Sequence, residues 1–334
     1  DLVTEFDKRS EALLLARIRE RFPDHGILAE ESGVHAGAPD ATVRWICDPL
    51  DGTTNFAHNY PFFGVSVGVE VAGTMAAGVV YDPVRDELFA AAAGHGATLN
   101  GTPIHVSGIT TIEDALLVTG FPYDVREFPE RHLPLFQSFL LRAQGVRRDG
   151  SAALNLCYLA MGRFDGMWEG NLSPWDIAAG SLIITEAGGL IGNFTGESDF
   201  LHQREVVAGN PKVYGQLVKL LTPFSRVITE EEAAPAPAPP VIASPRWSWA
   251  MLSQLAPVSG VIALCVAICL IGAAWLPFAP SNSSAKPKSS ENRFACTLGK
   301  SRLATAPMPA RSAPMFRVMA GKLTMMTAQS NVFE

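Results

Sequence analysis

The sequence predicts a layered α+β fold for residues 1–224, and three observations support it. Apolar residues recur with helical spacing in some segments and with strand alternation in others. Residues 63–71 and 74–81 have the pattern of two strands joined by a tight turn at Ala72-Gly73, which indicates an antiparallel pair. Strands and helices are mixed along the segment. This mixture, with antiparallel hairpins in it, is typical of layered structure and argues against a simple doubly wound parallel sheet.

Several segments of residues 1–224 have the pattern of a single helix or strand. Residues 8–22 carry leucine, isoleucine and phenylalanine at helical spacing, and Pro23 follows them, so a helix is predicted there. A helix over residues 174–187 would end at Gly188-Gly189, a pair typical of a C-terminal cap. The remaining elements are strands at residues 26–29, 43–47 and 87–92 and helices at residues 134–143 and 152–160.

Composition limits the classes of function. The chain has 334 residues, 48% of them hydrophobic, which is ample for a buried core. Its net charge is −7, and a general nucleic-acid binder needs the opposite, a surplus of Lys and Arg that displaces counterions from phosphates. A metal-dependent enzyme that acts on an anion stays open. The five cysteines contain no C-x-x-C pair, so neither a disulfide framework nor a zinc site is indicated.

The chain divides into three segments that differ in net charge. Residues 1–232 carry a net charge of −14, residues 233–280 contain one arginine, and residues 281–334 carry +6. Glutamates followed by an Ala/Pro run predict a linker at residues 225–257, because consecutive prolines favour extended polyproline geometry. The tail at residues 279–334 is basic and has little periodicity, so we expect it to be mostly disordered.

Residues 258–278 form a candidate transmembrane segment. These 21 residues carry no charge and as a helix would rise about 30 Å, which matches the core of a bilayer. A buried core helix is the alternative interpretation. Basic residues follow the segment, so the positive-inside rule would leave the preceding domain outside the cell, yet the chain opens with Asp1 and shows no signal peptide. We therefore expect a cytoplasmic protein, with membrane anchoring through residues 258–278 left open.

Candidate chemistry concentrates in residues 48–55, which read Asp-Pro-Leu-Asp-Gly-Thr-Thr-Asn. Asp48 and Asp51 lie at the end of an apolar strand, in a turn that no apolar contact would stabilise. Mg²⁺ favours a few carboxylate oxygens together with waters and phosphate oxygens. Gly52-Thr53-Thr54 can open a helical turn whose free N–H groups attract phosphate. Taken alone, an ordinary Asp-rich turn explains the same residues.

Two further segments add carboxylates. Glu30-Glu31 follows a short apolar strand, and Asp176 lies in the first turn of a helix that Ser173 can cap. Taken separately, the glutamates fit a solvated surface and Asp176 fits a charge that complements the helix dipole. The combination of the three segments favours a metal site.

Seven segments carry a pattern that can be compared with known families: DLVTEFD (1–7), LAEESG (28–33), WICDPLDGTTNFAHNYPFFGVSVGV (45–69), GATLNGTPI (96–104), DGSAALNLCYLAMGRFDGMWEGNLSPWDIAAG (149–180), TEAGG (185–189) and VAGNP (207–211). They resemble the inositol monophosphatase family, most closely its bacterial SuhB-type members. The resemblance implies a layered αβαβα sandwich of the sugar phosphatase type. It also implies Mg²⁺-dependent hydrolysis of phosphate monoesters with two or three ions per site, inhibition by Li⁺, and a homodimer.

The resemblance assigns roles to single residues. It implies that Glu30, Asp48 and the backbone carbonyl of Leu50 hold one metal ion, and that Asp48 bridges to a second ion held also by Asp51 and Asp176. Thr53 would position the attacking water, while Asp7 and Glu31 would orient ligands and waters. The N–H groups of Gly52 and Thr53 would contact the phosphate, and Ala152 and Glu169 would contact the hydroxyls of a sugar or inositol.

The implied reaction converts inositol-1-phosphate to inositol and phosphate by a metal-activated water, on a small phosphorylated polyol. Histidinol phosphate, fructose-1,6-bisphosphate and 3′-phosphoadenosine nucleotides are alternative substrates within the superfamily. A non-catalytic regulator that binds the transcription machinery is a further alternative, and direct nucleic acid binding is not expected. Family members have an N-terminal helical segment before the part that matches Asp1, so we expect an N-terminally truncated fold with a C-terminal extension foreign to the family.

Overall fold

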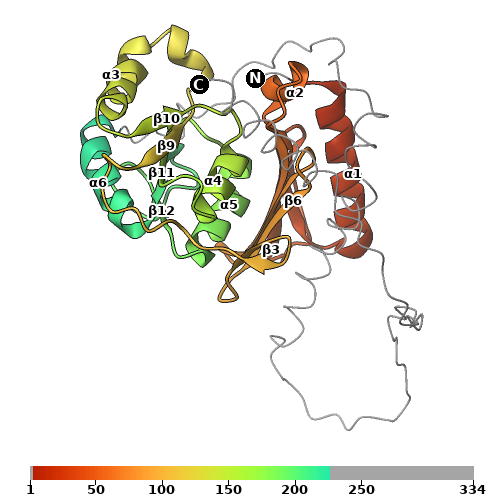
Figure 1. Cartoon of the computed structure of the whole chain (residues 1–334). Coiled ribbons are helices and arrows are strands. Elements are labelled where there is room, and N and C mark those ends of the chain that lie inside the picture. The colour runs from red at the N-terminus through yellow and green to blue at the C-terminus, as the bar shows by residue number, and fades with distance from the viewer. Residues whose placement is uncertain (1–2, 226–334) are drawn as a thin grey trace, which may run out of the picture. The chain divides into compact units, whose positions relative to one another are not determined.

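The computed structural model describes residues 3–225, which form two β-sheets with helices packed against them (Figure 1). All of these residues belong to the first of the two units into which the chain divides. The predicted linker beyond Ser225, the candidate segment at residues 258–278 and the tail lie outside the described residues. Within residues 3–225, no helix is both long and apolar enough to cross a membrane.

The larger sheet has eight strands in the order β2-β1-β3-β4-β5-β6-β7-β8. β1 runs parallel to β3, and every other neighbouring pair is antiparallel. The predicted pair at residues 63–71 and 74–81 is confirmed as β4 and β5. The strands are β1 (Gly26–Ala29), β2 (Gly33–His35), β3 (Val43–Asp51), β4 (Gly64–Val71), β5 (Thr74–Asp82), β6 (Glu87–Ala92), β7 (Ala97–Leu99) and β8 (Thr102–Pro103).

The smaller sheet has five strands in the order β10-β9-β11-β13-β12, and the residue pattern predicted none of these strands. β9 runs parallel to both β10 and β11, and β13 is antiparallel to β11 and β12. Its strands have only three to five residues, too few for an alternating pattern to stand out. They are β9 (Leu116–Thr119), β10 (Gly145–Arg147), β11 (Gly166–Gly170), β12 (Leu190–Gly192) and β13 (Glu205–Gly209).

Six α-helices complete the described residues: α1 (Glu5–Arg21), α2 (Thr53–Ala57), α3 (Pro129–Leu140), α4 (Ala152–Ala160), α5 (Pro174–Glu186) and α6 (Pro211–Leu221). Two 3₁₀ turns are also present: Tyr123–Arg126 precedes α3 and Thr222–Phe224 follows α6. The helix at residues 152–160 matches its prediction. The helix predicted at residues 134–143 instead begins at Pro129 and ends at Leu140, with Pro134 inside it. A proline in the first turn costs no helical hydrogen bond, and here Pro129 takes that place.

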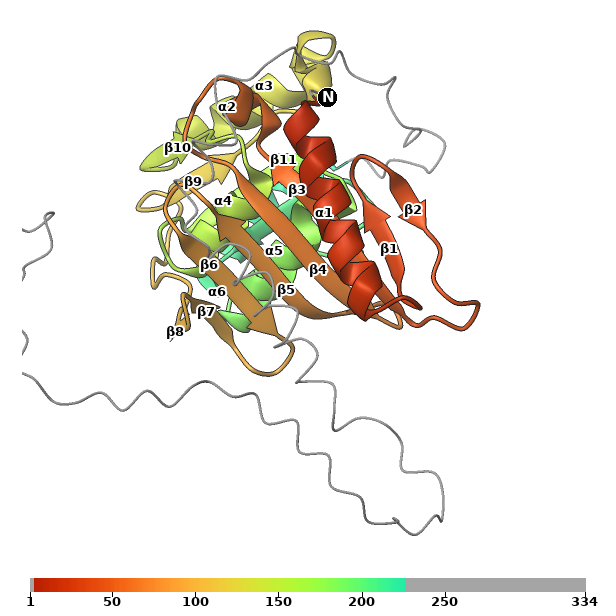
Figure 2. The ribbon, with the colours of Figure 1, turned by 90° about the vertical axis from the view of Figure 1, so that its right-hand side faces the viewer.

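The layers are αβαβα, as the resemblance implied. α1 lies across one face of the larger sheet (Figure 2) and buries Leu14 and Ile18 against Trp45 and Val67. α4 and α5 lie between the two sheets, where their side chains share one apolar cluster with Phe89 of the larger sheet and with the smaller sheet (Figure 1). α3 and α6 cover the outer face of the smaller sheet. Burial of these faces is the main driving force for the fold.

Candidate metal centre

Two aspartates at the end of β3 share one face because the strand is irregular between them. Asp48 pairs with Ser66 of β4 and Asp51 pairs with Gly64, so three steps along β3 match two along β4. Residues three apart on a regular strand point to opposite faces, and the extra residue of a bulge returns the second one to the first face. Pro49 lies within the bulge, where its missing N–H removes no ladder bond.

A third aspartate reaches this pair from the helix between the sheets. Oxygens of Asp48, Asp51 and Asp176 all lie within 4.8 Å of one another. Asp176 is the third residue of α5, and its Oδ2 accepts a hydrogen bond from the N–H of Ser173 at 2.7 Å, within a capping box. The predicted cap, first-turn proline and aspartate are therefore confirmed. The capping geometry fixes the rotamer that carries this carboxylate to β3.

Asp51 is anchored on its other side by α4. Its Oδ2 accepts hydrogen bonds from the hydroxyl of Ser151 at 2.5 Å and from the N–H of Ala153 at 2.7 Å. Burial raises the pKa of Asp51 to about 6 even though these donors favour the charged form. Sequence reasoning did not include Ser151. Its place before a helix marks it as a cap, but no sequence signal reports a contact with a residue one hundred positions away.

Glu30 approaches the same cluster from β1. Its N–H donates to the carbonyl of Cys47 at 3.2 Å, which holds it beside β3. Its Oε2 is buried and has no hydrogen-bond partner among residues 3–225. Burial, and then the charge of Asp176, raise the pKa of Glu30 well above its ordinary value. A buried oxygen without a donor is costly unless a cation or a proton satisfies it.

The electrostatics of the cluster fit a hard divalent cation. Burial and the charge of Glu30 raise the pKa of Asp48, and burial and the charge of Asp51 raise the pKa of Asp176 to about 7. No Lys or Arg forms a salt bridge with these carboxylates within the described residues. Carboxylate oxygens are the ligands that Mg²⁺ prefers, and a divalent ion would offset their mutual repulsion. The residues present therefore fit the predicted metal.

Thr53 and Asp7 join the site from two other elements. The hydroxyl of Thr53 lies 2.9 Å from Asp7 Oδ1 and 3.1 Å from the carbonyl oxygen of Leu50. Asp7 is fully buried, and its second oxygen accepts from the N–H and the hydroxyl of Thr4 in the capping box of α1. The first turn of α1 is thereby tied to the turn after β3. Asp7 thus holds the Thr53 hydroxyl in place, and its role in orienting ligands and waters stays a prediction.

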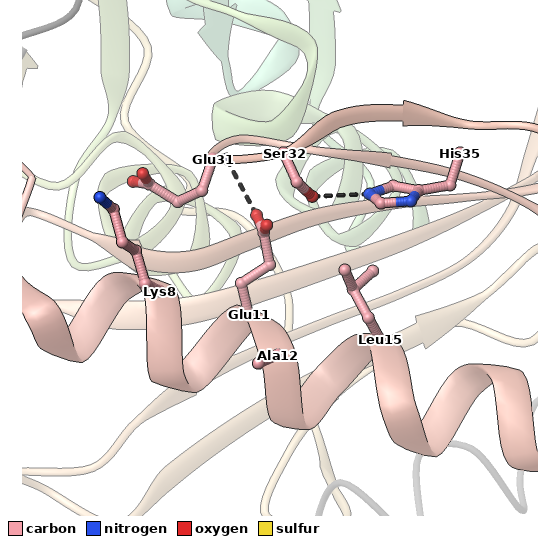
Figure 3. A pocket seen from close by; sticks show the side chains of 7 residues that line it. All are labelled: Lys8, Glu11, Ala12, Leu15, Glu31, Ser32 and His35. Carbon is pink, nitrogen blue, oxygen red and sulfur yellow. Dashed lines mark hydrogen bonds between the residues drawn. The ribbon is translucent and has the colours of Figure 1, made fainter.

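Glu31 lies beside this group at the edge of a surface hollow (Figure 3). Its N–H donates to Glu11 Oε2 at 2.9 Å, and burial followed by the charge of Asp7 raises the pKa of its carboxyl to about 7. Across the hollow, Ser32 and His35 form a hydrogen bond of 2.6 Å. Glu31 is the one predicted site residue among those that line the hollow, so the hollow adjoins the carboxylate cluster and does not contain it.

The turn after Asp51 has the predicted helical form. Gly52 caps α2 with a φ of 96°, a left-handed conformation that favours glycine. A Cβ there would also lie 3.1 Å from the carbonyl oxygen of Phe62 and 3.2 Å from that of Gly150. Phe56 donates the first helical hydrogen bond to Gly52, so the N–H groups of Gly52 and Thr53 precede the helical ladder. Asn55, which sequence reasoning did not assign, donates to the carbonyls of Phe62 and Asp149 and closes this turn.

The two predicted hydroxyl-binding residues lie on different elements. Ala152 is the first residue of α4 and is buried next to the Ser151 cap. Glu169 lies on β11, and its Oε2 is buried without a partner among residues 3–225. Burial, and then the charges of Asp176 and Asp51, raise the pKa of Glu169 to about 8. The structure thus brings Glu169 into the electrostatic environment of the cluster, which favours its protonated form.

Comparison with known proteins agrees with this architecture. Residues 1–225 match the sequence model of the Inositol monophosphatase family. The chain is 44% identical over 226 residues to "Nus factor SuhB" of Pseudomonas aeruginosa, which covers 67% of this chain and 83% of that protein. It is 45% identical over 236 residues to "Inositol-1-monophosphatase" of Synechocystis, covering 71% and 82%.

A solved structure gives the same result for the fold. The inositol monophosphatase of Anabaena superposes with a TM-score of 0.63 at 47% identity, covering 65% of this chain and 86% of that one. The sequence motifs and the layers agree with these comparisons. The chain therefore belongs to the inositol monophosphatase family of phosphatases.

Proposed function

We propose that this protein hydrolyses a phosphate monoester with the help of Mg²⁺, and that inositol-1-phosphate is its substrate. The observation that carries the proposal is the cluster of Asp48, Asp51 and Asp176, whose oxygens lie within 4.8 Å of one another. The unpartnered Oε2 of Glu30 adds a fourth buried carboxylate that a cation would satisfy. The family and the relative named inositol-1-monophosphatase support the choice of reaction.

In this proposal two overlapping sets of residues bind two metal ions. Glu30, Asp48 and the carbonyl of Leu50 would hold one Mg²⁺, and Asp48, Asp51 and Asp176 would hold a second. When bound, Mg²⁺ lowers the pKa of a water and neutralises the ester oxygen that leaves. The four carboxylates carry a charge of −4 when all are ionised, so they repel a phosphate dianion until cations offset it.

The chain's own polar groups would orient the reactants. The Thr53 hydroxyl donates its hydrogen bond to Asp7 Oδ1 or to the Leu50 carbonyl oxygen. Its lone pairs can then accept a hydrogen bond from the attacking water. The N–H groups of Gly52 and Thr53 precede the helical ladder and can donate to phosphate oxygens. Glu169 and the N-terminal turn of α4 at Ala152 would contact the polyol hydroxyls.

Phosphate release tests the proposal and chooses among its alternatives. Inositol-1-phosphate, histidinol phosphate, fructose-1,6-bisphosphate and a 3′-phosphoadenosine nucleotide are assayed with Mg²⁺ and with a chelator. We expect release that requires Mg²⁺ and is fastest from inositol-1-phosphate, and we expect Li⁺ to inhibit it. Release that persists in the chelator contradicts the metal proposal, whereas a faster alternative substrate contradicts only the choice of substrate.

A regulatory role is the second candidate, because one similar protein is named a Nus factor. A regulator that does no chemistry has no need to keep four like-charged carboxylates together at an energetic cost. The presence of all four candidate ligands here favours catalysis. An inactive protein that still binds Mg²⁺ would favour the regulatory role.

Three further expectations stay predictions. They are the homodimer, the lack of direct nucleic acid binding, and membrane contact through residues 258–278. Sedimentation of the full chain with and without lipid vesicles tests the first and the third.

A further inference from the structure

The candidate metal centre joins two elements that are separate in the sequence. Asp48 and Asp51 belong to β3, whereas Asp176 belongs to α5. Their oxygens can converge only if α5 is held at one height and one rotation over the larger sheet. The contacts between α5 and the sheet therefore determine the geometry of the centre.

Two of these contacts set the distance of α5 from the sheet and fix its far end. A Cβ at Gly78 of β5 would lie 2.7 Å from the carbonyl oxygen of Ala179, so the glycine allows the helix backbone to touch the sheet. At the C-terminal end, the carboxylate of Glu186 accepts from the N–H groups of Gly94 and Gly96 at 2.8 and 2.7 Å. Neither contact lies at the end of α5 that carries Asp176.

Ser66 supplies the contact at that end. It is fully buried on β4, where it is the direct partner of Asp48 in the strand register. Its hydroxyl donates to the carbonyl oxygen of Trp175 at 3.2 Å, and Trp175 immediately precedes Asp176. One hydroxyl thus links the neighbour of one candidate ligand to the neighbour of another.

We propose that Ser66 is a positioning residue, which sets the approach of Asp176 to Asp48 and Asp51 through the Trp175 carbonyl. The inference rests on the proposed metal function of these aspartates. A first-turn carbonyl also accepts the helical N–H four residues on, so α5 keeps its own hydrogen bond without Ser66. Loss of the hydroxyl should therefore leave the helix intact and loosen its placement.

The test compares two buried serines in the full chain. Ser66→Ala removes the bond between sheet and helix, whereas Ser181→Ala removes a buried hydroxyl that bonds to Ala178 within α5 itself, at 2.8 Å. Calorimetric titration measures Mg²⁺ binding without turnover, thermal unfolding measures stability, and Mg²⁺-dependent phosphate release separates half-saturation from kcat.

For Ser66→Ala we expect Mg²⁺ affinity to fall about three- to tenfold, as one lost hydrogen bond would produce. The Mg²⁺ concentration that gives half-maximal phosphate release should rise by the same factor. The kcat at saturating Mg²⁺ should stay within about twofold of the wild type. Ser181→Ala should match the wild type in Mg²⁺ affinity and match Ser66→Ala in stability. Unchanged affinity in Ser66→Ala, or an equal loss in both variants, overturns the role of Ser66. A wild type that binds no divalent cation overturns the proposed function, and this inference with it.

Discussion

Two of the buried aspartates, Asp165 and Asp48, differ in what surrounds them. Asp165, near the smaller sheet, accepts from the Ser107 hydroxyl at 2.5 Å and from the Leu116 N–H at 2.7 Å, one bond on each oxygen. Asp48, in the candidate metal centre, accepts from the Leu50 N–H and otherwise faces Glu30, Asp51 and Asp176. The first carboxylate is satisfied by neutral donors and holds strands together. The second is surrounded by like charges, which indicates a site that a cation completes.

The largest expected effect follows from removal of the shared ligand. Asp48→Asn should lower turnover on the order of a thousandfold, or about 4 kcal/mol, because it removes an oxygen that both proposed ions need. The metal-free variant should be at least as stable as the wild type, since one of several repelling charges has gone. Phosphate release and chemical denaturation check the two halves of this prediction. Near-native turnover by folded Asp48→Asn at limiting Mg²⁺ would refute the assignment of this ligand.

The opposite result is expected at the other aspartate. Asp165→Asn can keep the Leu116 N–H bond with its amide oxygen, but its N–H₂ then faces the Ser107 hydroxyl. That oxygen already accepts from Asn210 Nδ2 at 3.0 Å, and the Ser107 proton loses its acceptor. Stability should fall by about 1–3 kcal/mol while the turnover of the folded fraction stays unchanged. Denaturant midpoints and activity per folded molecule measure this. If stability were unchanged and activity lost, the contrast drawn between Asp165 and Asp48 would be wrong.

A smaller effect concerns the pH dependence of stability. Burial, followed by the charge of Asp176, raises the pKa of Glu169 to about 8 from about 4.5. The folded state then holds a proton that the unfolded state has released, so the stability from this group is full below about pH 4.5 and lost as pH rises to about 8. As pH rises from 5.5 to 7.5, the free energy of unfolding of the metal-free wild type should fall by about 2 kcal/mol more than that of metal-free Glu169→Gln. Parallel pH curves for the two proteins would contradict the shift.

The smallest effect is expected beyond the described residues. Every candidate ligand lies between Asp7 and Asp176, within the family domain at residues 1–225. A chain of residues 1–232 should therefore keep the Mg²⁺ half-saturation and kcat of the full chain within about twofold. Side-by-side assays compare the two chains. Loss of Mg²⁺-dependent hydrolysis in the shorter chain would place part of the catalytic fold in residues 233–334.

Much of the fold and the site could be predicted from local sequence. The strands at residues 26–29 and 87–92 and the helix at residues 152–160 have strong patterns with clear ends, and the structure matches them. The convergence of Asp48, Asp51 and Asp176 followed from a family resemblance, because spacing alone left an ordinary turn open. The αβαβα resemblance implied a second sheet, but local sequence could not predict its strands, because they are short and pair over long distances in the sequence.

The supporting contacts of the site were also beyond local reasoning. Ser151 reaches Asp51, and Ser66 reaches Trp175, across about one hundred residues each. The bulge between Asp48 and Asp51 depends on the register of β4 and is not encoded by the Asp-Pro-Leu-Asp spacing alone. Such contacts arise from tertiary packing, and they decide whether separate carboxylates form one site.

Diffraction from crystals soaked in Mn²⁺ would locate a cation bound at the candidate metal centre, because Mn²⁺ shares the preference of Mg²⁺ for oxygen ligands and scatters anomalously. An anomalous peak is expected within about 2.5 Å of oxygens from Asp48, Asp51 and Asp176, and none at Asp165. An Asp48→Asn crystal soaked in the same way serves as the control and should lose or weaken the peak. Absence of the peak in the wild type, with the three carboxylates in their present positions, would contradict the account that a cation completes this cluster.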